Sequence, residues 1–335
     1  MRNLPGGGTL AGMETAFTEL IGCRVPVQLA PMGGMCTPEL AAAVANGGGA
    51  AMLSLPLTTP AEVAATLDEV DRLTAGPVGV SFLVPFLDRE CLAVAAARSP
   101  LLDFFYGDPD PELVAAGHAH GALVSWQVGS AAEARAAVAA GCDVVVAQGT
   151  EAGGRHRGGL PLAALLDEVV AAVPVPVLAA GGIGSGRDVA ACLAAGAAGV
   201  RMGTRFLAAA ESAAHPRYRA ALVGASAEDT VRTSAFSVGW PGGPEPHRVL
   251  RSCVEAAAAF PGDVTGSLRI GERTLTLPRF GFPPPTLGAT GAIEAMALYA
   301  GTSVDAVSTI APAAEILEEV VRGAEARLTA AGGTR

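Results

Sequence analysis

Residues 177–205 read VLAAGGIGSGRDVAACLAAGAAGVRMGTR, and this stretch indicates the fold more clearly than any other. It begins with the short apolar run Val177–Ala180, passes through a glycine-rich turn and continues with the alanine-rich segment Gly186–Ala195. A second apolar run, Gly199–Met202, follows and ends at Gly203. A buried strand, a turn, a helix and a second buried strand make up the repeating unit of a parallel sheet that is covered on both faces.

The same alternation extends back through the first two-thirds of the chain. It predicts eight strands, at Val25–Leu29, Ala50–Leu53, Val78–Phe82, Leu102–Tyr106, Leu123–Val128, Asp143–Ala147, Val177–Ala180 and Gly199–Met202. The segments between them are rich in Ala, Leu, Glu and Arg and predict helices, for example at Pro38–Asn46, Pro60–Leu73 and Ala131–Ala140. We therefore predict an α/β fold, a (β/α)8 TIM barrel, with a doubly wound sheet as the competing architecture.

The composition changes after about Ser212. Two stretches there are rich in Gly and Pro, and helical patterns follow at Ala292–Ala300 and Ala313–Leu328. We expect a barrel over residues 17–212 and a smaller, mostly helical, substrate-covering region over residues 213–300. Residues 301–335 are expected to form a C-terminal helix that packs back on the barrel.

Charge and composition exclude several classes of protein. The chain has 335 residues and a net charge of −10, and it contains no Lys, which rules out a Schiff-base lysine. No basic run is present, so nucleic-acid binding is disfavoured. The longest apolar stretch, Val169–Ile183, is broken by Pro174 and Pro176 and is too short to cross a membrane. No group of residues has metal-ligand spacing.

Two further observations bear on the cellular compartment. Met1–Leu10 has no apolar core of the kind found in a secretory signal. The six cysteines are scattered among apolar neighbours without CxxC spacing, which is typical of free thiols in a reducing environment. We expect a cytoplasmic protein.

Glycine-bearing loops follow several of the predicted strands. In a barrel, ligands bind at the carboxyl ends of the strands. The loops after the last two strands, Gly181–Gly184 and Gly203–Thr204, offer backbone amides without side-chain bulk, which suits a phosphate. Any one such loop is more often only a tight turn, but two adjacent ones favour a cofactor that carries a phosphoryl group.

Five segments together resemble a known family. They are LAPMGGMCTPELAAAVANGGG (29–49), AQGTEAGGRHRGG (147–159), AAGGIGSGRDVAA (179–191), GVRMGTRFLA (199–208) and EAMALYAG (294–301). In this order they resemble the nitronate monooxygenase (2-nitropropane dioxygenase-like) flavoproteins, from about Phe17 to Gly301. These proteins are FMN-containing (β/α)8 barrels with a small extra domain, and the family includes or borders flavin-dependent enoyl-acyl carrier protein reductases and NADH:quinone reductases.

The resemblance implies a set of FMN-binding residues. Ala30–Gly33 would lie under the isoalloxazine ring, Gln148 and Gly153 would contact the flavin, and the glycines after the last two strands would hold the phosphate. Ser81 stands where family members often carry Asn. The full set is Ala30, Pro31, Met32, Gly33, Ser81, Gln148, Gly153, Gly181, Gly182, Met202, Gly203 and Thr204. Trp240 and Tyr299 are candidates to line the pocket, although aromatic residues more often serve core packing.

The catalytic position is occupied differently from the family pattern. In the family, EAGG is followed directly by a His that removes the α-proton of a neutral nitroalkane, whereas here Arg155 precedes His156. If Arg155 is a one-residue insertion, His156 is the base. The flexible Gly153-Gly154 pair can accommodate the extra residue, which slightly favours this interpretation. Without a gap, Arg155 takes the place; it cannot accept a proton but can bind the two oxygens of a nitronate. The third alternative is a solvated loop without a role.

The function implied by the resemblance is FMN-dependent oxidation of an alkyl nitronate, of the propionate 3-nitronate type, with O2. The first alternative is reduction of an enoyl thioester or a quinone by NAD(P)H on the same barrel. The second is a low-turnover or redox-neutral flavoprotein, because fold similarity alone does not decide between activities. The expected partners are a small-molecule substrate and O2, with no nucleic acid and no membrane, and a homodimer is left open.

Overall fold

The computed structural model describes residues 13–332, and its core is a closed barrel of eight parallel strands in the order β1-β2-β3-β4-β5-β6-β8-β9. The predicted (β/α)8 barrel and its eight strands are confirmed. The barrel strands are β1 (Val27–Leu29), β2 (Ala50–Ser54), β3 (Val78–Leu83), β4 (Leu101–Phe105), β5 (Leu123–Val128), β6 (Val144–Gln148), β8 (Val177–Ala180) and β9 (Gly199–Met202). The barrel closes where β9 pairs with β1, with Gln28 opposite Arg201.

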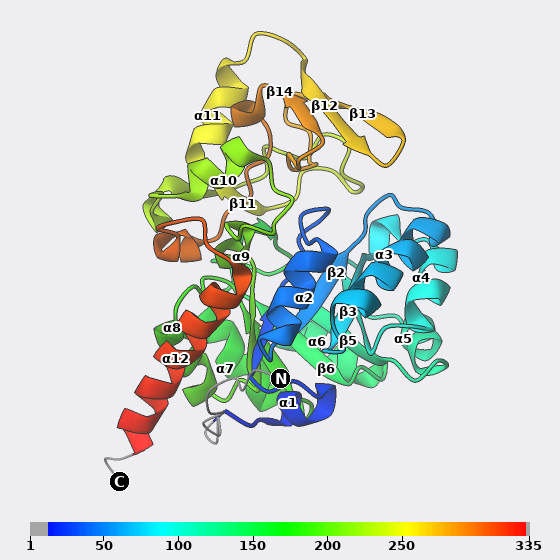
Figure 1. The fold of residues 1–335 in the computed structure, drawn as a ribbon, viewed down its shortest axis with the longest axis vertical. Coiled ribbons are helices and arrows are strands. Elements are labelled where there is room, and N and C mark those ends of the chain that lie inside the picture. The colour runs from blue at the N-terminus through cyan, green and yellow to red at the C-terminus, as the bar shows by residue number, and fades with distance from the viewer. Residues whose placement is uncertain (1–12, 333–335) are drawn as a thin grey trace, which may run out of the picture.

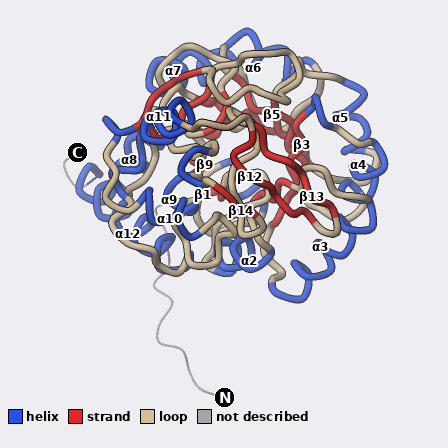
Figure 2. The backbone as a smooth tube through the Cα atoms, turned by 90° about the horizontal axis from the view of Figure 1, so that it is seen from above, coloured by secondary structure: helices blue, strands red, loops and turns tan. Residues whose placement is uncertain are grey.

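The helices form an outer ring around the strands, as the view from above shows (Figure 2). Thr37 and Thr59 cap the second and third helices, each followed by a proline in the first turn, where a missing N–H costs nothing. The helices of this part are α1 (Ala16–Ile21), α2 (Pro38–Asn46), α3 (Pro60–Leu73), α4 (Arg89–Ala96), α5 (Pro111–His118), α6 (Ala131–Ala139), α7 (Leu162–Ala172), α8 (Gly186–Ala194) and α9 (Thr204–Leu207), with a 3-10 turn, η1, at Val84–Phe86.

Apolar packing closes the barrel at its amino-terminal end. Phe17 and Ile21 of α1 belong to a buried cluster with inward-facing residues of the strands, including Met52 and Leu101. The larger core lies between the strands and the surrounding helices. The strands are buried on both faces, and α1 covers the amino-terminal end of the barrel. The carboxyl end is therefore the end at which a ligand site can form.

A second region lies above that end in Figure 1. It contains the helices α10 (Pro216–Leu222) and α11 (Arg251–Ala259) and two small sheets, β10-β11-β7 and β13-β12-β14. Their strands are β7 (Gly154–Arg155), β10 (Thr230–Thr233), β11 (His247–Leu250), β12 (Val264–Ile270), β13 (Arg273–Pro278) and β14 (Ala289–Gly291); the 3-10 turns are η2 (Ala227–Asp229), η3 (Ile293–Ala295) and η4 (Thr302–Ala306). The final helix, α12 (Ala313–Gly332), packs against α8 and α2, so the helix predicted at Ala313–Leu328 is confirmed.

Two sequence-based expectations for this region are wrong. It is a mixture of strands and helices rather than mostly helical, because β12 and β13 form a hairpin around the two-residue turn Gly271-Glu272. The predicted helix Ala292–Ala300 forms only the short turn η3. The backbone after it is extended and bonds to β11, through Leu250 N–H to Leu298 O and Ala300 N–H to Arg248 O, so tertiary pairing overrides the helical propensity of its alanines.

The described residues contain no helix that is both long and apolar enough to cross a membrane. Met1–Leu10, on which the expectation about a secretory signal rests, and the last three residues of the predicted C-terminal segment lie outside the described residues. The boundaries at residues 212 and 300 stay a prediction.

Candidate active site

A cavity of about 400 Å³ opens at the carboxyl ends of the barrel strands, beneath the second region. Its inner part is lined by the loops that follow β1, β2, β6, β8 and β9. Its outer part is lined by the hairpin β12–β13, through Leu268, Ile270 and Leu275, and by the segment Phe282–Pro284. The site therefore lies between the barrel and the second region.

Most of the residues proposed for FMN lie together on this cavity. Those that line it are Ala30, Pro31, Met32, Gly33, Ser81, Gln148, Gly153, Gly181, Gly182, Gly203 and Thr204. Met202 does not: it ends β9, is 1% exposed and packs in the core between strands and helices. Trp240 and Tyr299 also line the cavity.

The two glycine loops line the cavity after β8 and β9. Gly181 and Gly182 have φ values of 112° and 71°, in the region that only glycine adopts easily. A Cβ atom on Gly182 would lie 2.9 Å from the Cβ of Glu151, so this loop has no room for a side chain. Gly203 directly precedes α9, and the Oγ1 of Thr204 accepts a bond of 2.9 Å from Gly301 N–H, which leaves its hydroxyl proton for a ligand. Backbone amides free of side-chain bulk beside helix starts can hold a phosphate.

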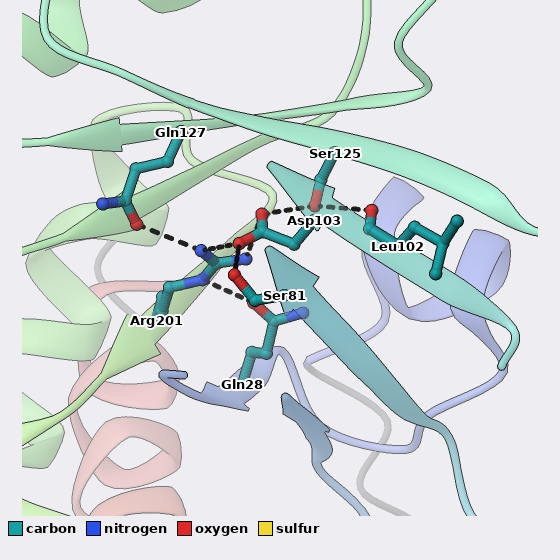
Figure 3. Close-up of polar contacts among 7 residues, drawn as sticks. All are labelled: Gln28, Ser81, Leu102, Asp103, Ser125, Gln127 and Arg201. Carbon is teal, nitrogen blue, oxygen red and sulfur yellow. Dashed lines mark hydrogen bonds and ion pairs between the residues drawn. The ribbon is translucent and has the colours of Figure 1, made fainter. Parts of the chain in front are cut away.

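The floor of the cavity contains a buried ion pair that the sequence reading missed (Figure 3). Arg201 of β9 and Asp103 of β4 are joined by two bonds, of 2.9 and 3.0 Å, and Arg201 also donates to Gln28 at 2.7 Å and Gln127 at 3.0 Å. Asp103 further accepts from Ser81 at 2.8 Å and Ser125 at 2.6 Å. Each carboxylate oxygen thus has two donors.

A signal for this network was present in the sequence. Asp103 and Arg201 are charged residues within predicted strands that are otherwise apolar. A charge in a strand buried on both faces needs a partner of opposite sign. The two partners come from strands almost a hundred residues apart in the chain, and only barrel closure shows that they meet.

Arg155 lies on the wall of the cavity that faces the second region. Its strand, β7, pairs with β11, with Arg155 opposite His247. The side chain is 7% exposed; its Nη2 donates to Phe236 O at 2.8 Å, and its guanidinium carbon lies 3.8 Å from the centre of the Trp240 ring. Its Nη1 has no hydrogen-bond partner, and no carboxylate of the described residues lies within 4 Å of its nitrogens. Burial lowers the pKa of this guanidinium, Tyr299 and the charge of Glu245 act in the opposite direction, and the group stays protonated at neutral pH.

His156, the next residue, does not line the cavity. It is 1% exposed, and its ring Nε2 bonds to Ala152 O at 2.6 Å, while Nδ1 has no partner. Burial lowers its pKa to about 4, so the ring is neutral at pH 7. Of the two residues that the sequence offered for the catalytic place, Arg155 lines the cavity and His156 does not; which of them is catalytic stays a prediction.

No group of three or more His, Cys, Asp or Glu within residues 13–332 is arranged to hold a metal ion. The described residues that line the cavity likewise include no His, Cys, Asp or Glu. Its ionisable residues are Arg155, Arg201, Arg269, Tyr218 and Tyr299. Burial raises the pKa of Tyr299 to about 12, so this phenol stays protonated at neutral pH and cannot accept a proton there.

Comparison with known proteins places these features in context. The sequence model of a family described as nitronate monooxygenase matches residues 14–91 and 86–323. The chain is 34% identical over 266 residues, 77% of its length and 71% of the relative's, to (3aS,4S,5R,7aS)-5-hydroxy-7a-methyl-1-oxo-octahydro-1H-indene-4-carboxyl-CoA dehydrogenase of Rhodococcus jostii. Among solved structures, FabK from Thermotoga maritima superposes with a TM-score of 0.79 at 29% identity over 96% of this chain and 99% of that one. Nitroalkane oxidase from Streptomyces ansochromogenes gives 0.77 at 29% identity over 95% and 99%.

Proposed function

This chain belongs to the nitronate monooxygenase family and is an oxidoreductase, and from that premise we propose that it binds FMN and oxidises an alkyl nitronate, of the propionate 3-nitronate type, with O2. The observation that carries the proposal is Arg155, a buried cation on the wall of the cavity that no carboxylate of the described residues contacts. An isolated buried charge is strongly unfavourable unless a counter-charge reaches it. A nitronate is an anion with two oxygens, and a guanidinium binds such a group as it binds a carboxylate.

The absence of a base among the described residues that line the cavity supports the same substrate. A neutral nitroalkane must lose its α-proton before it reacts, which requires a group with a pKa near neutrality within reach. Arg155 cannot take that proton, and Tyr299 stays protonated at neutral pH and cannot take it either. A preformed nitronate has already lost the proton. We therefore infer a preference for the nitronate over the neutral nitroalkane.

The residues on the cavity fit an FMN cofactor. The glycine loops would hold its phosphate, and Ala30–Gly33 and Gln148 would lie along its ring. When bound, FMN would supply an acceptor for electrons from the substrate carbon and a reduced form that reacts with O2. The protein's own contribution is to anchor the anion at Arg155 and to exclude water with the apolar residues of the hairpin β12–β13 and Phe282.

A glycine substitution tests the phosphate site. Gly203 has room for a side chain, since a Cβ there would meet only Ala30 and Met32, at 3.5 and 3.7 Å. Gly203→Asp should therefore fold but lose flavin, because it places a carboxylate beside the phosphate, whereas Gly203→Ala should keep it. FMN released on denaturation is the readout. Full occupancy in Gly203→Asp would mean that the phosphate lies elsewhere.

A second candidate is oxidation or reduction of an acyl thioester, with NAD(P)H as donor in the reductive direction. The observation that favours it is the apolar outer part of the cavity, lined by Leu268, Ile270 and Leu275, which a short nitronate does not need. The name of the Rhodococcus jostii relative, a carboxyl-CoA dehydrogenase, agrees with such a substrate class.

Anaerobic mixing separates the two candidates. If the first is right, propionate 3-nitronate bleaches the flavin absorbance within the time of one turnover, and NAD(P)H does so slowly. Rapid bleaching by NAD(P)H together with no reaction of the nitronate would replace the first candidate by the second. Failure of both donors would point to a low-turnover or redox-neutral protein.

A further inference from the structure

Two buried hydrogen-bond donors on one wall of the cavity have no hydrogen-bond acceptor among residues 13–332. They are Nη1 of Arg155 and Nε1 of Trp240, and both side chains are more than nine-tenths buried, at 7% and 6% exposure. The guanidinium carbon lies 3.8 Å from the centre of the indole ring, so the two donors belong to one stacked pair. A buried donor without an acceptor is costly, and the cost of two at one place indicates that a ligand supplies the acceptors.

The chain holds Trp240 in place through its backbone and through its ring. The backbone N–H of Trp240 donates to Ser237 O at 3.0 Å. In the same turn, the backbone N–H of Val238 donates to Phe280 O, and Val238 O accepts from the N–H of Phe282. The indole is enclosed by the rings of Phe86, Tyr106 and Phe282, with centroids 4.9–5.5 Å from its own. Tyr106 has a φ of 68°, an unusual conformation for a bulky residue and one that is kept where the surroundings require it.

The second tryptophan of the chain shows what a purely structural indole looks like here. Trp126 of β5 is 1% exposed and packs on Phe104, and its Nε1 donates to Gly107 O at 3.1 Å. Its polar atom is satisfied within the protein. Trp240 is also buried, at 6% exposure, but its Nε1 has no acceptor among the described residues, and it lies beside a cation.

We propose that Trp240 is a specificity-determining residue, whose indole N–H and the Nη1 of Arg155 together bind one planar anionic group of the substrate. The stacked indole ring also fixes the plane of the guanidinium. Such a pair offers donors to two oxygens and excludes a neutral group that cannot compensate the charge of Arg155. The proposal rests on the proposed function for the identity of the anion, a nitronate, but the anion site itself does not depend on turnover.

The test removes the N–H while it keeps the ring. Trp240→Phe should raise the KM for propionate 3-nitronate about tenfold, the loss expected for one charge-assisted hydrogen bond, with little change in kcat. Nitrate, a planar anion that does not react, should inhibit the holoenzyme competitively, and its inhibition constant should rise by the same factor. Trp126→Phe is the matched control and should change neither constant.

A binding measurement on the same holoenzyme does not need activity. In Trp126→Phe, Trp240 is the remaining tryptophan, and nitrate should quench its fluorescence with saturation at the inhibition constant. If Trp126→Phe does not fold, the quenching that is present in the wild type and lost in Trp240→Phe gives the same information. Unchanged KM and nitrate inhibition in Trp240→Phe, or no saturable quenching by nitrate, would overturn the proposal.

The two proposals fail in different ways. If nitronate bleaches the flavin but Trp240→Phe behaves as wild type, the nitronate oxidase stands and the role of Trp240 falls. If nitronate does not bleach the flavin but nitrate quenches Trp240 and Trp240→Phe weakens nitrate binding, the anion site stands and the substrate is a different anion.

Discussion

Two buried arginines lie on the same cavity, and their surroundings are opposite. Arg201, on the barrel floor, donates four hydrogen bonds and faces Asp103, so its charge is neutralised inside the protein (Figure 3). Arg155, on the wall below the second region, has one bond to a carbonyl, a stacked indole and an interaction with Tyr299, and no carboxylate of the described residues contacts it. Under the proposed function, the difference separates a charge that stabilises the fold from a charge that binds the substrate.

The matched substitution of each arginine by methionine sharpens this comparison, and the larger effect is expected at the floor. Arg201→Met leaves Asp103 buried and unpaired, which should lower the free energy of unfolding by about 3–5 kcal/mol. The measurement is urea unfolding followed by circular dichroism. The double variant Arg201→Met/Asp103→Leu removes both charges and should recover most of the loss, and an Arg201→Met protein as stable as the wild type would contradict the role assigned to the pair.

Acidification should weaken the wall that carries Arg155. His156 and His247 are buried in this wall, and burial lowers the pKa of each to about 4. His247 Nε2 accepts from Phe236 N–H at 3.1 Å, and Phe236 O in turn accepts from Arg155. The network around Arg201 contains no histidine among its described members.

The sign follows from the lowered pKa. Between about pH 6.5 and pH 4 the unfolded chain binds a proton that the folded imidazole does not, so stability falls as the pH falls through this window and levels off below it. Each histidine should contribute about 3 kcal/mol over the full window. Carboxylates titrate there as well, so the comparison is between wild type and His247→Gln, whose stability should depend less steeply on pH. Parallel curves would show that His247 carries no such linkage.

Arg155→Met should separate binding from stability. It keeps the apolar stem over Trp240 and removes a buried charge, so the free energy of unfolding should stay the same or rise. The KM for nitronate should rise by the loss of charge-assisted bonding, about 1.5–3 kcal/mol, or roughly 10- to 150-fold. Steady-state kinetics with preformed nitronate measure it.

His156→Ala is the control for that prediction. It should leave the KM for nitronate near the wild-type value, because His156 faces away from the cavity. If His156→Ala instead abolished turnover of a neutral nitroalkane and spared the nitronate, His156 would be the base and the reading based on Arg155 would fail.

The one-residue choice between Arg155 and His156 shows where sequence reasoning stops. Successive residues of a strand face opposite sides, so the pairing of β7 with β11 decides which of the two reaches the cavity. That register is set by a partner strand about ninety residues later in the chain, which a local pattern does not reveal. The barrel strands were predictable because each unit shows its apolar run, its glycine turn and its helix within a short stretch of sequence, and the same pattern recurs along the chain.

Other parts of the site show the same limit. The glycine loops that line the cavity were found from the sequence because a turn after a strand is a local signal. Asp103 and Arg201 stood out individually, but their pairing requires barrel closure. Conversely, the alternation in Arg273–Pro278 and the glycine turn before it are a local hairpin signal that the prediction of a mostly helical region overlooked.

A third arginine, Arg273, forms the ion pair that we expect to contribute least to the free energy of unfolding. Arg273, at the tip of the hairpin that covers the cavity, lies 3.7 Å from Glu62 of α3 and donates to Leu57 O, but its side chain and that of Glu62 are 52% and 39% exposed. Water and salt screen such a pair, which typically contributes about 0–1 kcal/mol. Arg273→Ala should therefore shift the urea midpoint only slightly, and 1 M salt should remove most of the difference from wild type. A loss as large as that in Arg201→Met would mean that the hairpin contact, rather than burial, determines how much an arginine pair stabilises this protein.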